Sequence, residues 1–448
     1  MFTTLKNAWR IPELKKKLLF TLFIIVLYRL GANILVPYVN PDLLETASFF
    51  SGGNILQFLN MLSGGALSQA TLLALGVSPY ITASIVMQLL TIAIPALERL
   101  SKQGEEGMKK ITAITCIVTV ALALVTSIAY TRFIVVGDGY TSYFVGERHF
   151  FKYVIMVACF CAGASLVMWL AEKINESGIG NGISMILFAN IIASMSSMFA
   201  SLWNLVFPAT GFRWWGIPIS LAEIALIIGI IMFIVWMTNA ERRIPIQYAK
   251  RVVGRKMYGG QNTHLPIKVN MSGVMPIIFA NSIVALPSTI ALIFQPKTGS
   301  LYSKVINFLS YGNVDQYTGE VLSANWPYVI LFVVLIIAFA YFYISISFNP
   351  VEVSNNLKKN GGFIPGIRPG KPTSDYISKV LNRIVLIGAF FLCLVAAVPM
   401  MANIIAGFTL SGIAFSGSSL LIVVGVAIET TREIEGQMTM RHYKGFLE

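Results

Sequence analysis

Few side chains of this sequence have the types and spacing that chemistry at a reactive centre requires. The three histidines fall outside the long apolar stretches: His149, His264 and His442. The four cysteines fall inside those stretches and form no C-x-x-C pair: Cys116, Cys159, Cys161 and Cys393. Zinc sites and disulfide frameworks need closely spaced or paired ligands. We therefore expect no metal site, no disulfide framework and no catalytic histidine.

A nucleotide-binding loop is also missing from the sequence. Gly370 and Lys371 are followed by Pro372, whereas the phosphate-binding motif needs Ser or Thr after its Gly-Lys pair. We therefore expect a chain that hydrolyses no ATP, needs no cofactor and is not an enzyme.

The composition indicates a membrane protein. The chain has 448 residues, of which 12% are charged, about half the usual share of a globular protein. Apolar residues make up 56%, the net charge is +13, and the mean hydropathy is +0.73. These values exclude a disordered chain and an ordinary soluble enzyme.

Ten apolar stretches are long enough to cross a bilayer, which takes about 20 residues of α-helix. They lie approximately at 18–37, 71–95, 111–133, 151–171, 182–201, 216–238, 272–295, 327–348, 380–401 and 409–428. Of the 33 Lys and Arg residues, 26 lie with the N-terminus, the even-numbered loops and the C-terminus, and six lie on the opposite side. The positive-inside rule therefore predicts that both termini are cytoplasmic.

One apolar stretch, residues 54–63, has helical periodicity but only half the required length. Glycine pairs flank it at positions 52–53 and 64–65. We predict a re-entrant half-helix, because irregular backbone at membrane depth is tolerated when it is buried or lines a cavity. The alternative is an amphipathic loop on the outer surface.

An internal repeat relates the second and seventh spans. Residues 76–83 and 273–280 are identical at five of eight positions, and five spans separate the two copies. An odd number of crossings inverts the second copy, which predicts two five-helix halves, residues 1–201 and 202–448, related by a pseudo-two-fold axis in the membrane. Chance similarity of two Gly- and Pro-containing windows is the alternative.

Few ionisable groups lie within the predicted spans or at their ends; they include Arg29 in the first span, Glu223 near the outer end of the sixth and Glu429 at the inner end of the tenth. Coupled transporters usually keep acidic or histidine side chains at mid-membrane. An inverted-repeat transporter of a small solute is therefore the weaker of two hypotheses. Two long cytoplasmic loops, at about 239–270 and 350–379, carry basic residues and Gly-Pro turns that favour docking of a soluble partner with an acidic or phosphate-rich surface.

Seven stretches, distributed along nearly the whole chain, resemble the SecY family, whose members are central subunits of the bacterial protein-conducting channel. They are residues 58–68, 74–84, 180–184, 248–251, 263–270, 362–370 and 419–424. The resemblance implies an all-α polytopic membrane protein with ten transmembrane helices in two inverted halves around a central pore. It also implies a channel that passes unfolded secretory polypeptides and releases apolar segments sideways into lipid.

The resemblance assigns site residues by motif position. The pore ring would be Val77, Ile81, Ile183, Leu187, Ile278 and Ile422. The plug, residues 53–65, would present Ile55, Leu56, Phe58, Leu59, Met61 and Leu62. The lateral gate, between spans two and three on one side and seven and eight on the other, would include Thr82, Ser84, Gln88, Asn281 and Ser282.

Partners are implied in the same way. The basic residues of loops six and eight would dock the motor ATPase SecA or the ribosome: Arg242, Arg243, Lys250, Arg251, Arg255, Lys256, Arg368 and Lys371. The small subunits SecE and SecG would be companions, and signal sequences, nascent polypeptides and membrane lipid would contact the pore and its gate. The resemblance implies the bacterial cytoplasmic membrane as the location.

Overall fold

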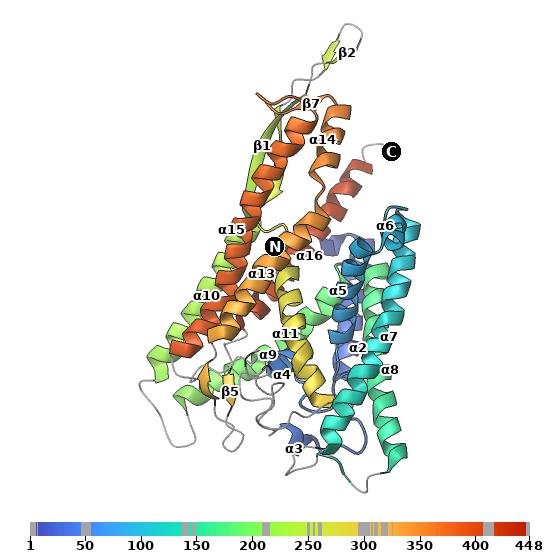
Figure 1. Ribbon diagram of the computed structural model, residues 1–448, viewed down its shortest axis with the longest axis vertical. Helices are drawn as coiled ribbons and strands as arrows, with labels where there is room; N and C mark the ends of the chain where they lie inside the picture. The colour runs from blue at the N-terminus through green and yellow to red at the C-terminus, as the bar shows by residue number, and fades with distance from the viewer. Residues whose placement is uncertain are drawn as a thin grey trace.

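The computed structural model describes residues 6, 8–45, 55–136, 143–145, 149–207, 216–248, 251–253, 256–258, 262–293, 305, 308, 312–314, 321–324, 326–405 and 416–444. Its fold is mostly helical (Figure 1). The helices of the first half of the chain are α2 (Pro12–Gly31), α3 (Pro41–Glu45), α4 (Ile55–Leu62), α5 (Ser78–Ala93), α6 (Pro95–Ser101), α7 (Glu105–Val136), α8 (Phe150–Ser177) and α9 (Gly182–Val206). Those that follow are α10 (Gly216–Asn239), α11 (Met275–Ile293), α13 (Trp326–Ser347), α14 (Pro350–Lys359), α15 (Lys371–Ile405) and α16 (Ser416–Lys444).

Several helices begin at residues suited to a helix start. The side chain of Asn181 accepts hydrogen bonds from the backbone N–H groups of Ile183 and Ser184, which caps α9. Asn349 caps α14 in the same way, and proline follows it at the first helical position. These caps fix where the chain leaves a loop and enters a helix.

Two predicted span boundaries are wrong. The first helix, α2, ends at Gly31 and not near residue 37, and a helix continued through Pro37 would lose a backbone hydrogen bond there. Residues 71–77 form turns, and α5 begins only at Ser78, where Pro79 provides the helix start. Leu35 and Thr71, one from each of these non-helical segments, form an isolated antiparallel bridge.

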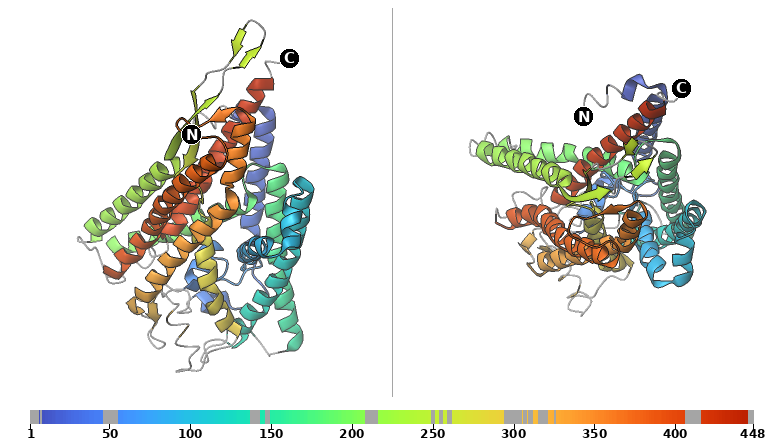
Figure 2. Two further views of the ribbon diagram at one scale, coloured as in Figure 1. Left: turned by 45° about the horizontal axis from the view of Figure 1, so that its top comes forward. Right: turned by 90° about the horizontal axis from the view of Figure 1, so that it is seen from above.

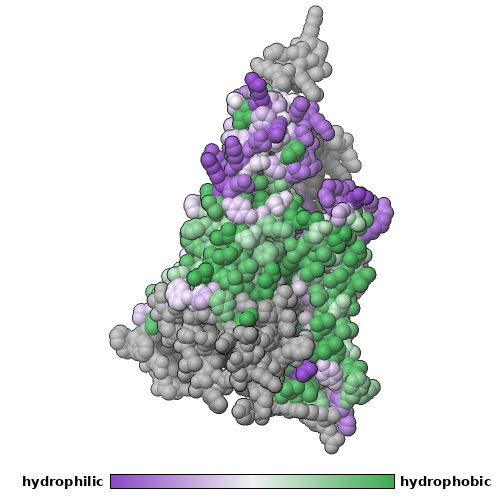
Figure 3. Space-filling view, viewed as in Figure 1, coloured by the Kyte–Doolittle hydropathy of each residue, from purple (hydrophilic) through white to green (hydrophobic). Residues whose placement is uncertain are grey.

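Within the described residues, five helices are long and apolar enough to span a membrane: Glu105–Val136, Phe150–Ser177, Ile217–Asn239, Trp326–Lys359 and Lys371–Pro399. The pair α5 and α6, bent by 104°, makes a sixth if it counts as one span. Shorter apolar helices cover Gly182–Ser196 and Met275–Val284. Hydrophobic side chains form a broad band below a hydrophilic top (Figure 3), as expected for a multi-pass membrane protein.

The helices lie in two groups that meet in the middle of the molecule. In one group α7 packs against α5 and α8, and α2 packs against α8. In the other, α13 packs against α11 and α15, and α16 packs against α10 and α15. The groups are joined through α11 with α7 and through α16 with α9, and α16 crosses diagonally between them in the view from above (Figure 2).

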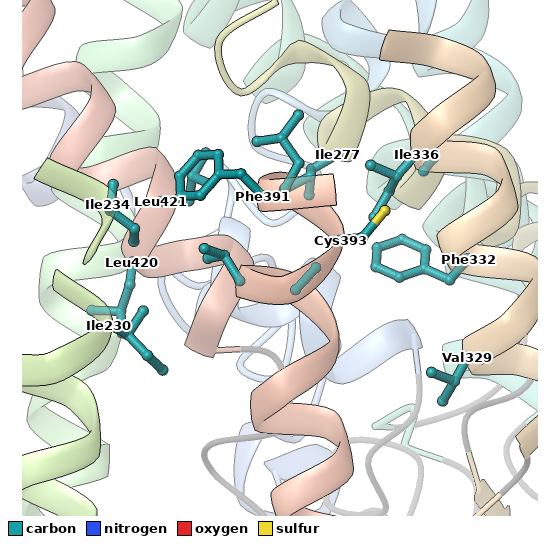
Figure 4. Packing of buried hydrophobic residues seen from close by; sticks show 14 of the residues in the cluster. Ile230, Ile234, Ile277, Val329, Phe332, Ile336, Phe391, Cys393, Leu420 and Leu421 are labelled. Carbon is teal, nitrogen blue, oxygen red and sulfur yellow. The ribbon is translucent and has the colours of Figure 1, made fainter. Parts of the chain in front are cut away.

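A large apolar cluster holds the second group together. Its buried side chains come from α10, α11, α13, α15 and α16. Cys393 of α15 lies beside Phe332 and Ile336 of α13, while Ile230 and Ile234 of α10 face Leu420 of α16 (Figure 4). Leu59, Met61 and Leu62, which are predicted plug residues, pack against the same cluster, which connects α4 to this group.

The strands are confined to connecting segments. β1 (Glu241–Tyr248) pairs antiparallel with β4 (Asn262–Lys268) along its length and with β7 (Gly362–Phe363) at its end, forming a three-stranded sheet in the order β4-β1-β7. β2 (Arg251–Val253) pairs with β3 (Lys256–Tyr258), and β5 (Gly312–Val314) pairs with β6 (Val321–Ala324). Because β7 belongs to loop eight, the sheet ties loops six and eight together.

Candidate functional site

A cavity of about 80 Å³ lies where α4, α5, α7, α9, α11 and α16 meet. Most of its lining is apolar. It is lined by Leu59, Leu62, Ser78, Pro79, Ile81, Thr82, Leu122, Thr126, Leu187, Ile278, Asn281, Ser282 and Ile422. Residues from three separately predicted features, the plug, the pore ring and the lateral gate, therefore share one cavity.

The six predicted pore-ring residues belong to a single hydrophobic cluster. Its buried members include Val77, Leu187, Ile278 and Ile422, and the partly buried Ile81 and Ile183 pack against them. Ile422 is 1% exposed and Ile278 is 9% exposed. Leu62 of α4 packs on the same cluster. The structure thus brings aliphatic side chains from α5, α9, α11 and α16 together beside the half-helix.

α11 packs directly against α5 and α7, and polar groups line the seam between them. The hydroxyl of Thr82 donates to the carbonyl of Ser78 at 3.1 Å, and that of Ser282 donates to the carbonyl of Ile278 at 2.9 Å. Asn281 is 3% exposed, and neither its amide nitrogen nor its amide oxygen has a partner among the described residues.

Two of the predicted gate residues lie apart from this cavity. Ser84 and Gln88 are a partly buried pair within α5, with Gln88 Nε2 3.5 Å from Ser84 Oγ. The structure therefore groups Thr82, Asn281 and Ser282, and it leaves Ser84 and Gln88 outside the cavity lining.

The segment predicted to be a plug contains a short helix, α4, of eight residues. It packs against α9 and α11. The side chains of Ile55, Leu56 and Phe58, and all of residues 53–54, lie outside what the structure describes. Two glycines with positive φ, Gly64 at 69° and Gly65 at 87°, turn the chain away after the helix.

One polar residue that contacts the end of α4 was not predicted from the sequence. Asn190 of α9 is fully buried, and its amide donates to the carbonyl of Leu62 at 2.7 Å and to the hydroxyl of Tyr28 at 2.8 Å. The available signal was a lone asparagine within the apolar stretch 182–201, because a buried amide in such a stretch needs hydrogen-bond partners.

The two basic loops form one exposed surface. Arg242, Arg243, Arg368 and Lys371 are exposed, and Glu241 pairs with Arg243 at 2.7 Å. Burial lowers the pKa of Lys268, which neighbours Arg432, and the nearby Glu429 and Glu241 partly oppose this shift. Lys250 and Arg255 lie outside the described residues, as do the side chains of Arg251 and Lys256.

The turn that presents Arg368 is held by side-chain hydrogen bonds. Thr373 donates to the carbonyl of Arg368, and Ser354 of α14 donates to the carbonyl of Gly370, both at 2.8 Å. Gly361, Gly366 and Gly370 have positive φ, which bends the chain into the exposed turn.

The described part of the chain contains no cluster of cysteines or of potential metal ligands that would form a reactive site. All four cysteines are free, and the thiol of Cys116 donates to a carboxylate oxygen of Glu172 at 2.8 Å. Among the described residues, no group of three or more His, Cys, Asp or Glu could hold a metal ion.

Comparison with known proteins decides the family. The model of the SecY family matches residues 71–431. The chain is 43% identical over 455 residues to the protein translocase subunit SecY of Streptomyces coelicolor, and the match covers 100% of both chains. The chain belongs to the SecY family.

Solved structures agree on the fold. A structure of a protein-conducting channel has a TM-score of 0.60 at 17% identity, covering 95% of this chain and 92% of that chain. Sec61 in the canine ribosome-channel complex from the endoplasmic reticulum has a TM-score of 0.55 at 16% identity, covering 95% and 92%. The predicted ten-helix membrane fold is confirmed, and the chain is a protein-conducting channel subunit.

Proposed function

We propose that this chain forms the pore of a protein translocation channel, through which unfolded secretory polypeptides cross the membrane and from which apolar segments leave sideways into lipid. The observation that carries the proposal is the single cavity shared by Leu62 of α4, Ile422 of the aliphatic cluster and Asn281 of the seam. A plug, a constriction and a gate have to meet at one place if one motion is to open all three.

In the proposed mechanism the six aliphatic side chains form the constriction. An apolar ring excludes water and blocks ions, while its flexible side chains yield to a passing polypeptide. The plug, residues 53–65, closes the pore from one side. When α11 separates from α5 and α7, an apolar signal sequence gains free energy by moving from water into hydrocarbon.

We assign roles to the rest of the chain and to its partners in the same mechanism. The two halves, residues 1–201 and 202–448, move as units, with both termini on the cytoplasmic side of a bacterial plasma membrane. The chain performs no catalysis itself, and SecA or a ribosome supplies the driving force. The exposed basic surface around Arg242 and Arg368 supports docking, because acidic and phosphate-rich partners are attracted to such a patch. SecE and SecG complete the channel.

Ion conductance in planar bilayers tests this mechanism. The chain, purified with its small helical partner, is compared with a deletion of residues 53–65. A matched control replaces residues 249–261, also 13 positions between β1 and β4, by a short Gly-rich turn. We expect the wild type and the control to stay closed and the plug deletion to leak. The small-solute transporter would be favoured if all three stay silent while a solute accumulates against its gradient.

A further inference from the structure

The C-terminal end of α4 is held partly by a residue from another helix. The last four carbonyls of an α-helix have no partner within the helix. In α4 the carbonyls of residues 59–61 accept the backbone N–H groups of residues 63–65, all within the local turn. The fourth carbonyl, that of Leu62, accepts from Asn190 at 2.7 Å. One distant side chain thus completes the hydrogen bonding of this helix end.

Asn190 joins three segments of the chain through one amide group. Its nitrogen donates to the carbonyl of Leu62, the last residue of α4, and to the hydroxyl of Tyr28 on α2. Asn190 and Tyr28 are both 0% exposed. Because a buried amide loses its water, each of these bonds is favoured over a conformation in which Asn190 stays buried without acceptors.

Arg29 lies against the same turn. Gly64 has a φ of 69°, and a Cβ atom placed there would lie 2.7 Å from Nη1 of Arg29 and 3.2 Å from Cα of Asn190. The backbone at Gly64 is therefore in close contact with both residues. A guanidinium at this position also faces the C-terminal end of α4, where the aligned peptide dipoles carry partial negative charge.

The remaining contacts of α4 are less directional. Leu59, Met61 and Leu62 are partly buried and pack on apolar clusters. Met61 also accepts a long contact from the hydroxyl of Ser419 at 3.7 Å. Apolar packing tolerates sliding and rotation, whereas the amide bond from Asn190 fixes the position of the helix end.

We infer that Asn190, positioned by Tyr28 and assisted by Arg29, forms a latch that retains α4 in the closed pore. Asn190 acts as a positioning residue for the plug, and the latch must release before α4 can move aside for a polypeptide. The inference rests on the proposed role of residues 53–65 as the plug. It adds the residue that sets how readily the plug leaves.

Ion conductance of the wild type and of three substituted chains, each with and without residues 53–65, tests the latch. The substitutions are Asn190→Ala, Tyr28→Phe and Asn33→Ala. Asn33 is the matched control, because its amide also donates to a backbone carbonyl, that of Arg29 at 3.0 Å, but it lies exposed just after α2 and makes no hydrogen bond to α4 among the described residues. Losing one net hydrogen bond predicts about a two- to tenfold rise in the open fraction for Asn190→Ala. Tyr28→Phe keeps the ring and should give a smaller rise.

The deletion background separates a latch from a general loss of structure. In chains without residues 53–65, Asn190→Ala should add nothing, because its partner carbonyl is gone. The latch is overturned if Asn190→Ala conducts no more than Asn33→Ala, or if its effect is the same in both backgrounds. If the deletion alone stays closed, the proposed plug and the latch fail together, whereas a leaking deletion with a silent Asn190→Ala overturns the latch alone.

Discussion

Asn281 places an amide, which has no hydrogen-bond partner among the described residues, inside the seam between α11 and the pair α5 and α7. A buried polar group without a partner costs about 1 to 3 kcal/mol. Asn281→Leu removes that penalty from the closed state only, so we expect the closed seam to become more stable. Signal sequences of low hydrophobicity should then be translocated less efficiently, while strongly apolar ones are little affected.

Asn33→Leu is the control for this substitution, because Asn33 is exposed near the end of α2. The measurement is the translocated fraction of a substrate series in which only the hydrophobicity of the signal sequence varies. Equal efficiency of Asn281→Leu and the wild type across the whole series would contradict the role given to the seam.

Ile422 is the most deeply buried of the six ring residues, at 1% exposure. We expect Ile422→Ser to raise the resting ion conductance several-fold, because a hydroxyl lets water enter an apolar constriction. Ile228→Ser is the matched control, since Ile228 of α10 is 52% exposed in a position that would face lipid. A leak of similar size in both variants would show that the effect does not come from the constriction.

The sequence predicts the residues of the site unequally well. Motif position selects the six ring residues, and the structure places them in one cluster, although their function as a constriction remains a prediction. Asn190 lies in none of the stretches that carry the family resemblance. Its importance depends on which carbonyl lies opposite, and that is decided by the packing of α4 against α9.

At the scale of elements, β7 connects the two basic loops. A Cβ at Gly362 would lie 3.0 Å from the ring of Tyr248 and 3.1 Å from the side chain of Leu357. Gly362→Ala should therefore disturb the pairing of β7 with β1 and reduce the affinity for a docking partner several-fold. The resting conductance should stay unchanged, since the loops lie away from the cavity.

Gly436→Ala is the control for this change, because a Cβ at Gly436 of α16 meets no atom of the described residues within 4 Å. Binding of purified ribosomes or of the motor ATPase to reconstituted chains measures the effect. If Gly362→Ala binds as well as Gly436→Ala, the joined sheet does not present the docking surface.

Hydrophobic length predicts where helices lie, but it predicts their ends less well. Residues 71–77 are apolar enough to extend a span, yet Gly76 adopts a φ of 52° and Pro79 starts the helix later. The sheet of loops six and eight was not predicted, because β1 and β7 are far apart in the sequence and their pairing depends on the fold. The start of α5 depends on a turn, and the sheet depends on which strands pair. Amino-acid composition indicates neither.

At the scale of the whole molecule, the ten-span topology predicts opposite exposure for two lysines. Lys371 is the first residue of α15 and Lys152 lies in the first turn of α8. Figure 1 shows that these two helices start at opposite ends of the helical bundle, α15 beside the basic loops. In a chain whose four cysteines are replaced by serine, a membrane-impermeant maleimide should label Lys371→Cys only from the cytoplasmic side and Lys152→Cys only from the opposite side. Labelling of both from one side would contradict the ten-span topology.

Transport of an unfolded secretory polypeptide by the reconstituted chain is the most direct measurement. Vesicles contain the chain with its small helical partner, the motor ATPase is added with ATP, and protease-protected polypeptide is quantified. We expect protection that requires the chain and is lost when the signal sequence is removed from the substrate. Equal protection in vesicles without the chain, or none with a folded chain and an active motor, would contradict it.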